Sequence, residues 1–341
     1  MELPNLDALR ALAVLLVLAD HVLETIVAGV GTFDPFDRYL GRLGVLLFFV
    51  HTCFVLMISL ERHGSSGWSL ARAFYIRRVF RLYPLAIVCV LAVVLIGVPA
   101  RPWDEFRFPE AFDFMSNLAL TMNLTGSPDV LAPLWTLPVE LQMYVLLPGI
   151  YLLVARDPSG DPAPITALYL LSLGAALLLP SLSPRLSLFA SAPAFMAGVV
   201  AYVWGQKVTP RFAGWAWLPF LAAIVGVYIA VEELTPGVHH IELAAAITLL
   251  VGLAIPMFAQ SSAGALNRVA RTLARYSYGV YLFNLIALWA AYYALPIEST
   301  ALKAATALGL LVAFSVAGYH LVEAPMMKWG HSPFPSKRGQ A

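Results

Sequence analysis

Apolar runs long enough to cross a bilayer recur along the whole chain, separated by short polar segments. A helix needs about 20 predominantly apolar residues to cross the hydrocarbon core. We therefore predict an all-α, polytopic integral membrane bundle of about ten transmembrane helices. The predicted spans are residues 6–28, 43–60, 84–100, 138–155, 164–181, 187–204, 214–231, 241–259, 276–295 and 301–322. Residues 101–137 form an amphipathic connection, in which we expect a loop with helical or re-entrant pieces.

Composition and charge agree with a membrane protein and set its orientation. The 341 residues are 60% hydrophobic and 12% charged, whereas soluble domains are about 25% charged. With a cytoplasmic N-terminus, 14 of the 21 Lys and Arg residues fall in cytoplasmic segments and six in outer segments. The positive-inside rule therefore places both termini in the cytoplasm. We expect a membrane domain over residues 1–330 and a short cytoplasmic tail over residues 331–341.

The first span carries two ionisable residues, Arg10 and His21, in an otherwise apolar run. Their spacing of about three helical turns puts both side chains on one face, roughly 16 Å apart along the axis. Ionisable groups inside a bilayer usually face a protein interior or an aqueous cavity. The pair predicts a polar pocket, although a histidine satisfied by a neighbouring helix and an arginine that reaches the headgroups would give the same pattern. Asp20 points about 100° away from His21 and is not an obvious partner.

The second span adds a further buried histidine, His51, next to Thr52, and its Gly44 permits close helix approach. Packing is the better explanation of these residues, and a place for His51 beside the catalytic groups is the alternative. Cys53 and Cys89 both fall in spans, where we expect packing rather than a disulfide or a zinc site. His239 and His240 fall in an outer loop without a set of further ligands, so no metal site is predicted.

A basic aromatic run, FYIRRVFRLYP, precedes the third span and is read as a cytoplasmic loop that forms an interfacial amphipathic helix. Arg77, Arg78 and Arg81 recur in it at helical spacing. Attraction to anionic lipid and the setting of topology are the simpler explanation. The alternative is a site for a phosphorylated cofactor, because guanidinium groups bind phosphate oxygens in a bidentate manner.

Three later segments place polar residues at the ends of spans. LWTLPVELQMYVLLP carries Glu140 and Tyr144 along one helix face, at a depth similar to that of His21. YSYGVYLFNL places Tyr281 and Asn284 on one side of the ninth span. Glu323 ends the tenth span, where it can pair with the loop arginines or form a surface ion pair of little energy.

Taken together and in this order, these segments resemble the membrane acyltransferase 3 family, over nearly the whole chain and in its stand-alone form. Arg10 and His21 resemble the Arg-x10-His motif, and Arg77, Arg78, Arg81 and Pro84 resemble the basic loop. Trp135, Thr136, Glu140, Gln142 and Tyr144 are similar to the Trp-Ser-Leu-x-x-Glu segment. This chain has Asn284 where the family's tyrosine-rich segment typically ends in histidine, which puts more weight on His21.

The resemblance implies an integral membrane O-acyltransferase of the bacterial inner membrane, without a nucleic-acid partner. It would move an acetyl group from acetyl-CoA to a hydroxyl of a polysaccharide, glycolipid or small-molecule acceptor. His21 would be the general base and Glu140 would orient it, with Arg10 near the inner mouth. Arg77, Arg78, Arg81 and Arg10 would bind the cofactor phosphates. Trp135, Tyr144, Tyr281 and Asn284 would line the substrate site, with Thr52, Tyr281 or Asn284 as oxyanion donors.

Two other functions explain the hydrophobic pattern. A multi-pass transporter or flippase for a glycan, lipid or small anion would also place charged groups inside the membrane, but it commonly shows internal repeats, and none is evident in this sequence. A non-catalytic membrane scaffold would leave the buried ionisable residues unexplained.

Overall fold

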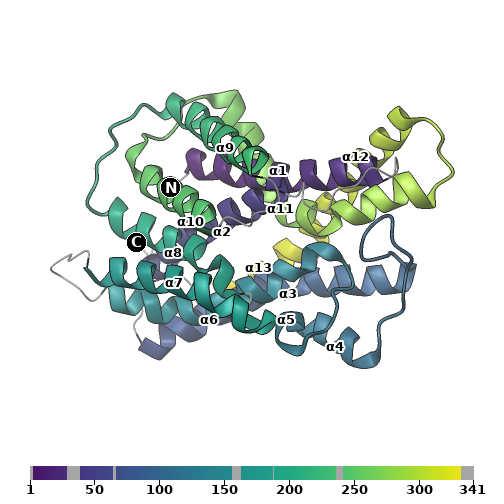
Figure 1. The fold of residues 1–341 in the computed structure, drawn as a ribbon, viewed down its shortest axis with the longest axis horizontal. Helices are drawn as coiled ribbons and strands as arrows, with labels where there is room; N and C mark the ends of the chain where they lie inside the picture. The colour runs from purple at the N-terminus through teal and green to yellow at the C-terminus, as the bar shows by residue number, and fades with distance from the viewer. Residues whose placement is uncertain are drawn as a thin grey trace. The chain divides into compact units, whose positions relative to one another are not determined.

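The computed structural model describes residues 3–28, 39–63, 67–155, 163–186, 188–235 and 241–331, and in these ranges the chain is helical. Figure 1 shows the order of the helices along the chain. Within the described ranges, six runs are long and apolar enough to cross a membrane. These runs are α2 (Tyr39–Arg62), α3 (Gly67–Ile96), η1 with α6 (Ala132–Trp135, Thr136–Ala155), α7 (Ala163–Leu182), η3 with α9 (Gly214–Ala216, Trp217–Leu234) and α12 with η6 and α13 (Thr300–Ala317, Gly318–Glu323, Ala324–His331).

The remaining helices are shorter or carry more polar residues. They are α1 (Pro4–Ala28), α4 (Ala111–Ala119), α5 (Met122–Thr125), η2 (Pro184–Leu186), α8 (Leu188–Gly205), α10 (Ile241–Ala254), η4 (Ile255–Met257), α11 (Gly264–Trp289) and η5 (Ala290–Ala294). All ten predicted spans therefore coincide with helices, and the all-α prediction is confirmed for the described residues. The expected helical pieces of the connection between residues 101 and 137 are α4, α5 and η1.

The predicted boundary between the basic loop and the third span is wrong. α3 runs without interruption from Gly67 to Ile96 and contains Pro84. Trp68 to Tyr83 contains no glycine or proline that would end a helix. Pro84 removes one backbone hydrogen bond, and the neighbouring Leu82 and Leu85 are buried on either side of it. Packing around the proline therefore maintains a helix that the sequence divides into two parts.

The chain divides into two compact units, and several helices continue from one unit into the other. The first unit comprises Met1–Val17, Phe36–Leu70 and Gln142–Arg275. Within it α8 packs against α2, α7 and α10. Gly198 of α8 makes this approach possible, because a Cβ there would lie 2.5 Å from the Val50 carbonyl oxygen of α2. Small residues bring membrane helices close together in this way.

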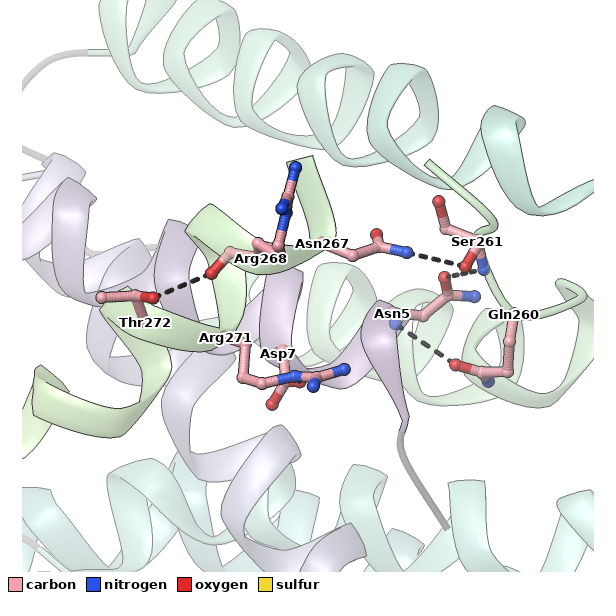
Figure 2. A network of polar contacts seen from close by, with 8 residues as sticks. All are labelled: Asn5, Asp7, Gln260, Ser261, Asn267, Arg268, Arg271 and Thr272. Atoms are coloured by element: carbon pink, nitrogen blue, oxygen red, sulfur yellow. Dashed lines mark hydrogen bonds and ion pairs between the residues drawn. The ribbon is translucent and has the colours of Figure 1, made fainter. Parts of the chain in front are cut away.

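Asn5 fixes the start of α1 inside the first unit, as Figure 2 shows. Its backbone N–H donates to Gln260 Oε1 at 3.2 Å, and its side-chain oxygen accepts from the Ser261 N–H at 3.0 Å. The Asn5 carbonyl accepts from the Trp217 indole at 2.9 Å. A residue that the sequence analysis did not single out therefore joins α1 to α9 and to the segment before α11.

The second unit comprises Leu18–Pro35, Ala71–Leu141 and Tyr276–Ala341, of which residues 29–35 and 332–341 lie outside the described ranges. α11 meets α12 at Gly279, where a Cβ would lie 2.8 Å from the Ser315 Cα. Two π-helical turns, η5 and η6, follow α11 and α12. Cys89 in this unit and Cys53 in the first unit are free and buried, as the packing prediction requires.

Candidate active site

His21 lies on the part of α1 that belongs to the second unit, and Asn284 of α11 is its hydrogen-bond partner. The His21 Nδ1 and Asn284 Oδ1 atoms are 2.6 Å apart. The imidazole is partly exposed, whereas Asn284 is 1% exposed. Asn284 Nδ2 donates to the carbonyls of Val280 at 3.1 Å and Tyr281 at 2.7 Å. Both amide protons of Asn284 are thus directed at its own helix, and its oxygen faces the imidazole.

This arrangement determines the tautomer of His21. Carbonyl oxygens only accept hydrogen bonds, so the two backbone contacts fix which end of the Asn284 amide is nitrogen. The amide oxygen can only accept, and therefore His21 Nδ1 carries the hydrogen. The Nε2 atom of the neutral ring is then left with its lone pair. A ring held in this state can remove a proton from a bound hydroxyl through Nε2.

Two carboxylates, those of Asp20 and Glu24, accompany His21 on the same helix. One ligand atom of each of the three residues lies within 4.8 Å of the others, and both acids are buried. Among the described residues this is the group whose composition and spacing would suit a small cation. Neither Asp20 nor Glu24 was predicted as a site residue, although the i, i+3 spacing of Glu24 from His21 places these two on neighbouring positions of one face.

Other contacts engage the predicted oxyanion donors, Tyr281 and Asn284, and the residue predicted to orient His21, Glu140. The Tyr281 hydroxyl donates to the Pro133 carbonyl at 2.8 Å and shares a hydrogen bond with Thr136 Oγ1 at 2.7 Å. Glu140 is buried, and its charge acts on the hydroxyl of Tyr281. Asn284 hydrogen-bonds to His21, and the orienting role of Glu140 stays a prediction.

The basic run lies on α3, and its three arginines have different surroundings. Arg77 is 7% exposed, and the Arg78 guanidinium lies 5.8 Å from the centre of the Phe74 ring. Arg81 pairs with Glu323 of η6 and lies over the Tyr278 ring at 5.3 Å. The expected pairing of Glu323 with a loop arginine is confirmed, and the Glu323 side chain is buried at 1% exposure whereas Arg81 is 19% exposed. Part of the Arg81 charge is therefore compensated within the protein.

Several other predicted residues belong to the first unit. The Arg10 guanidinium lies 5.3 Å from the Phe48 ring centre, and the His51 ring lies 6.4 Å from the same ring. Tyr144 is buried in this unit. Trp135, in the second unit, is 45% exposed, so its indole is open to a ligand or to lipid. His239 and His240 lie outside the described residues.

Curated proteins that match the chain are O-acetyltransferases by name. Peptidoglycan O-acetyltransferase OatA of Listeria monocytogenes is 28% identical over 164 residues, which is 45% of this chain and 25% of that protein. The protein named Putative peptidoglycan O-acetyltransferase YrhL of Bacillus subtilis is 28% identical over 170 residues, with the same two shares. The match thus spans about a quarter of the length of these relatives. No solved structure matches the chain.

The acyltransferase domain model, Acyl_transf_3, matches residues 3–320, which is nearly the whole chain. Its range contains both His21 and Asn284, as well as the basic run of α3 and Glu140. The resemblance recognised in the sequence motifs is therefore confirmed, and this multi-pass helical membrane protein belongs to the acyltransferase 3 domain family.

Proposed function

We propose that this protein is an integral membrane O-acetyltransferase that moves an acetyl group from acetyl-CoA to a sugar hydroxyl of a polysaccharide or glycolipid. The observation that carries the proposal is the 2.6 Å contact between His21 Nδ1 and Asn284 Oδ1, which directs Nδ1–H at the amide oxygen and gives the basic lone pair of the neutral ring to Nε2. The family supports acyl transfer, and the names of the relatives support a carbohydrate acceptor.

In the proposed reaction His21 Nε2 removes the proton from the acceptor hydroxyl. The oxygen attacks the thioester carbonyl carbon, and the carbon–sulfur bond breaks. The protonated His21 returns its proton to the departing thiolate. Asn284 holds Nδ1–H throughout, so the ring presents the same nitrogen in both proton transfers. The Thr136 and Tyr281 hydroxyls are engaged with one another, so we place them as positioning groups on the acceptor side.

Acetyl-CoA would supply the activated acetyl group, and the residues on α3 suit its phosphates. Three arginines, Arg77, Arg78 and Arg81, lie close together on α3, in the unit that holds His21. Planar guanidinium groups bind phosphate oxygens with two parallel hydrogen bonds. Phosphate binding by Arg77, Arg78 and Arg81 stays a prediction, and Glu323 compensates part of the Arg81 charge. Arg10 stays a predicted contact of the cofactor at the cytoplasmic end of the proposed site.

The proposed membrane arrangement has ten spans, with both termini on the cytoplasmic side of a bacterial cell membrane. The uneven distribution of Lys and Arg between the two sets of loops supports it. The donor would approach from the cytoplasm, where the basic end of α3 lies in this arrangement. Residues 1–330 would then form one membrane domain followed by a short tail.

The experiment compares wild type and His21→Ala in nanodiscs, with radiolabelled acetyl-CoA and an extract of host glycans and lipids. We expect label to move into the extract with wild type, and His21→Ala to reduce the rate by about 10²- to 10⁴-fold, the usual contribution of a general base. His320→Ala is the matched control, because His320 is an exposed histidine of the same unit.

Near-normal transfer by His21→Ala, in a protein that unfolds at the wild-type temperature, would exclude His21 as the base. Absence of acetyl-CoA binding and of label transfer by wild type would instead favour a transporter.

A further inference from the structure

A cavity of about 780 Å³ lies in the second unit, between the end of α3 and the segments around α4 and α5. Its size is within the range of sites for small molecules. Its charged lining residues are Asp104, Glu105, Arg107, Glu110, Asp113 and Asp129. Two phenylalanines, Phe106 and Phe108, add an apolar wall, and the Phe108 ring is 76% exposed. Nothing in the reaction described above uses these residues.

The walls of this cavity are joined by one fully buried side chain, Asn117 of α4. Its Nδ2 donates to the carbonyls of Asp113 and Pro128, both at 2.9 Å, and its Oδ1 accepts from the Val130 N–H at 3.0 Å. The carbonyl of Ala100, on a third wall, accepts a hydrogen bond from the Ala132 N–H at 2.9 Å. The cavity is therefore preformed, which reduces the entropy that a ligand must remove on binding.

The lining has five carboxylates and one guanidinium, so it is strongly acidic. Burial raises the pKa of Asp129 to about 6, because desolvation disfavours the charged carboxylate. A positively charged ligand would favour the ionised form of Asp129 and be attracted by the other acids. A negatively charged ligand would be repelled by the same groups. Carboxylates also accept hydrogen bonds from hydroxyl groups, so the lining suits a hydroxylated ligand.

The cavity is linked to His21 by consecutive contacts inside the second unit. The Ala132 N–H donates to the carbonyl of the lining residue Ala100 at 2.9 Å, and the carbonyl of the next residue, Pro133, accepts from the Tyr281 hydroxyl at 2.8 Å. The backbone carbonyl of Tyr281 accepts from Asn284, and Asn284 holds His21. A chain of hydrogen bonds therefore joins the wall of the cavity to the imidazole inside one unit.

We propose that this cavity binds the acceptor and selects it by charge. A sugar that carries a positively charged amino group binds most tightly, a neutral sugar binds less tightly, and a sugar acid is excluded. The proposal rests on the proposed function in one respect, namely that the bound sugar is the one acetylated at His21. Charge selection itself is a property of the cavity and is measured without any transfer.

The test measures dissociation constants of three oligosaccharides of equal length for the full chain in nanodiscs. The probes are a glucosamine oligomer with protonated amines, an N-acetylglucosamine oligomer and a uronic acid oligomer. We expect affinity to fall in that order. The double variant Glu105→Gln/Glu110→Gln should weaken the glucosamine oligomer about three- to tenfold, since each exposed ion pair contributes little, and should leave the N-acetylated oligomer unchanged. Added salt should have the same selective effect.

Glu298→Gln is the matched control, since Glu298 is an exposed acid of the same unit outside the cavity. Equal affinity for the three oligomers, no binding of any of them, or an unchanged glucosamine affinity in the double variant would each overturn the proposal. His21-dependent label transfer in the same preparation tells the two hypotheses apart. Transfer without charge selection would disprove only the proposal that the cavity selects the acceptor by charge. Charge selection without transfer would disprove the proposed function.

Discussion

At the scale of single residues, Asn284 is the side chain on which the protonation state of His21 depends. Its amide supplies one acceptor to the imidazole and two donors to α11. Leucine has a similar volume but no acceptor, so Asn284→Leu would leave Nδ1–H unpaired and let the other tautomer compete. Loss of this kind of hydrogen bond costs about 1–3 kcal/mol, which corresponds to a fall in acetyl transfer of about 5- to 150-fold.

Substitution to histidine separates the acceptor role from simple packing. Histidine has one acceptor and one donor when neutral, so Asn284→His can still accept from His21 Nδ1–H and donate to the Tyr281 carbonyl. We expect it to retain most of the transfer rate that Asn284→Leu loses. The measurement is the pH profile of label transfer, with Asn123→Leu of α5 as a matched control. Equal losses in the leucine and histidine variants would indicate that Asn284 is only a packing residue.

At the scale of the elements, an ion pair with a buried carboxylate joins α3 to η6. Arg81 pairs with Glu323, whose side chain is 1% exposed, and Tyr278 of α11 covers the guanidinium. The Tyr278 hydroxyl in turn donates to the Leu82 carbonyl at 2.7 Å. Three helical elements therefore meet at one charge pair. Breaking such a pair from one side leaves a buried charge without compensation, at a cost of about 3–5 kcal/mol.

We therefore expect Glu323→Leu to lower the unfolding temperature clearly, and Arg81→Leu/Glu323→Leu to recover part of the loss. The pair of Asp7 and Arg271 in the first unit is the matched control. Its atoms are 3.9 Å apart and its side chains are 31% and 39% exposed, so Asp7→Leu should cost less than about 1 kcal/mol. A double variant as unstable as the sum of its single variants would show that the two charges do not stabilise each other.

At the scale of the whole molecule, hydrophobic runs predicted where helices occur, because burial in a bilayer demands long apolar segments. The start of α3 was predicted wrongly from these runs. A proline usually ends or kinks a helix, but packing around Pro84 maintains α3 through it. The motif spacing selected His21 and Asn284 but not their contact, which joins residues 263 positions apart. Asn5 and Asn117 were missed for the same reason, because a buried asparagine shows its partners only in the tertiary structure.

The number of crossings depends on α1, α8, α10 and α11, which fall outside the six helices that are long and apolar enough to cross a membrane. α11 has 26 residues, and its first half carries Arg268, Arg271 and Arg275. If its second half crosses the membrane, Ser262 and Glu298 lie on opposite sides, because they flank this helix and η5. Both residues are exposed, so either one can be replaced by cysteine without disturbing the core.

An impermeant maleimide added to intact cells should therefore label Glu298→Cys. It should label Ser262→Cys only after the membrane has been permeabilised. The background is low because Cys53 and Cys89, the two native cysteines, are both buried. Gln206→Cys, in the loop before α9, should behave like Ser262→Cys, since α9 and α10 lie between them and two crossings return the chain to the same side. Labelling of both Ser262→Cys and Glu298→Cys from outside would mean that α11 does not cross. The positive-inside arrangement, with a cytoplasmic C-terminus, would then be wrong from that point onward.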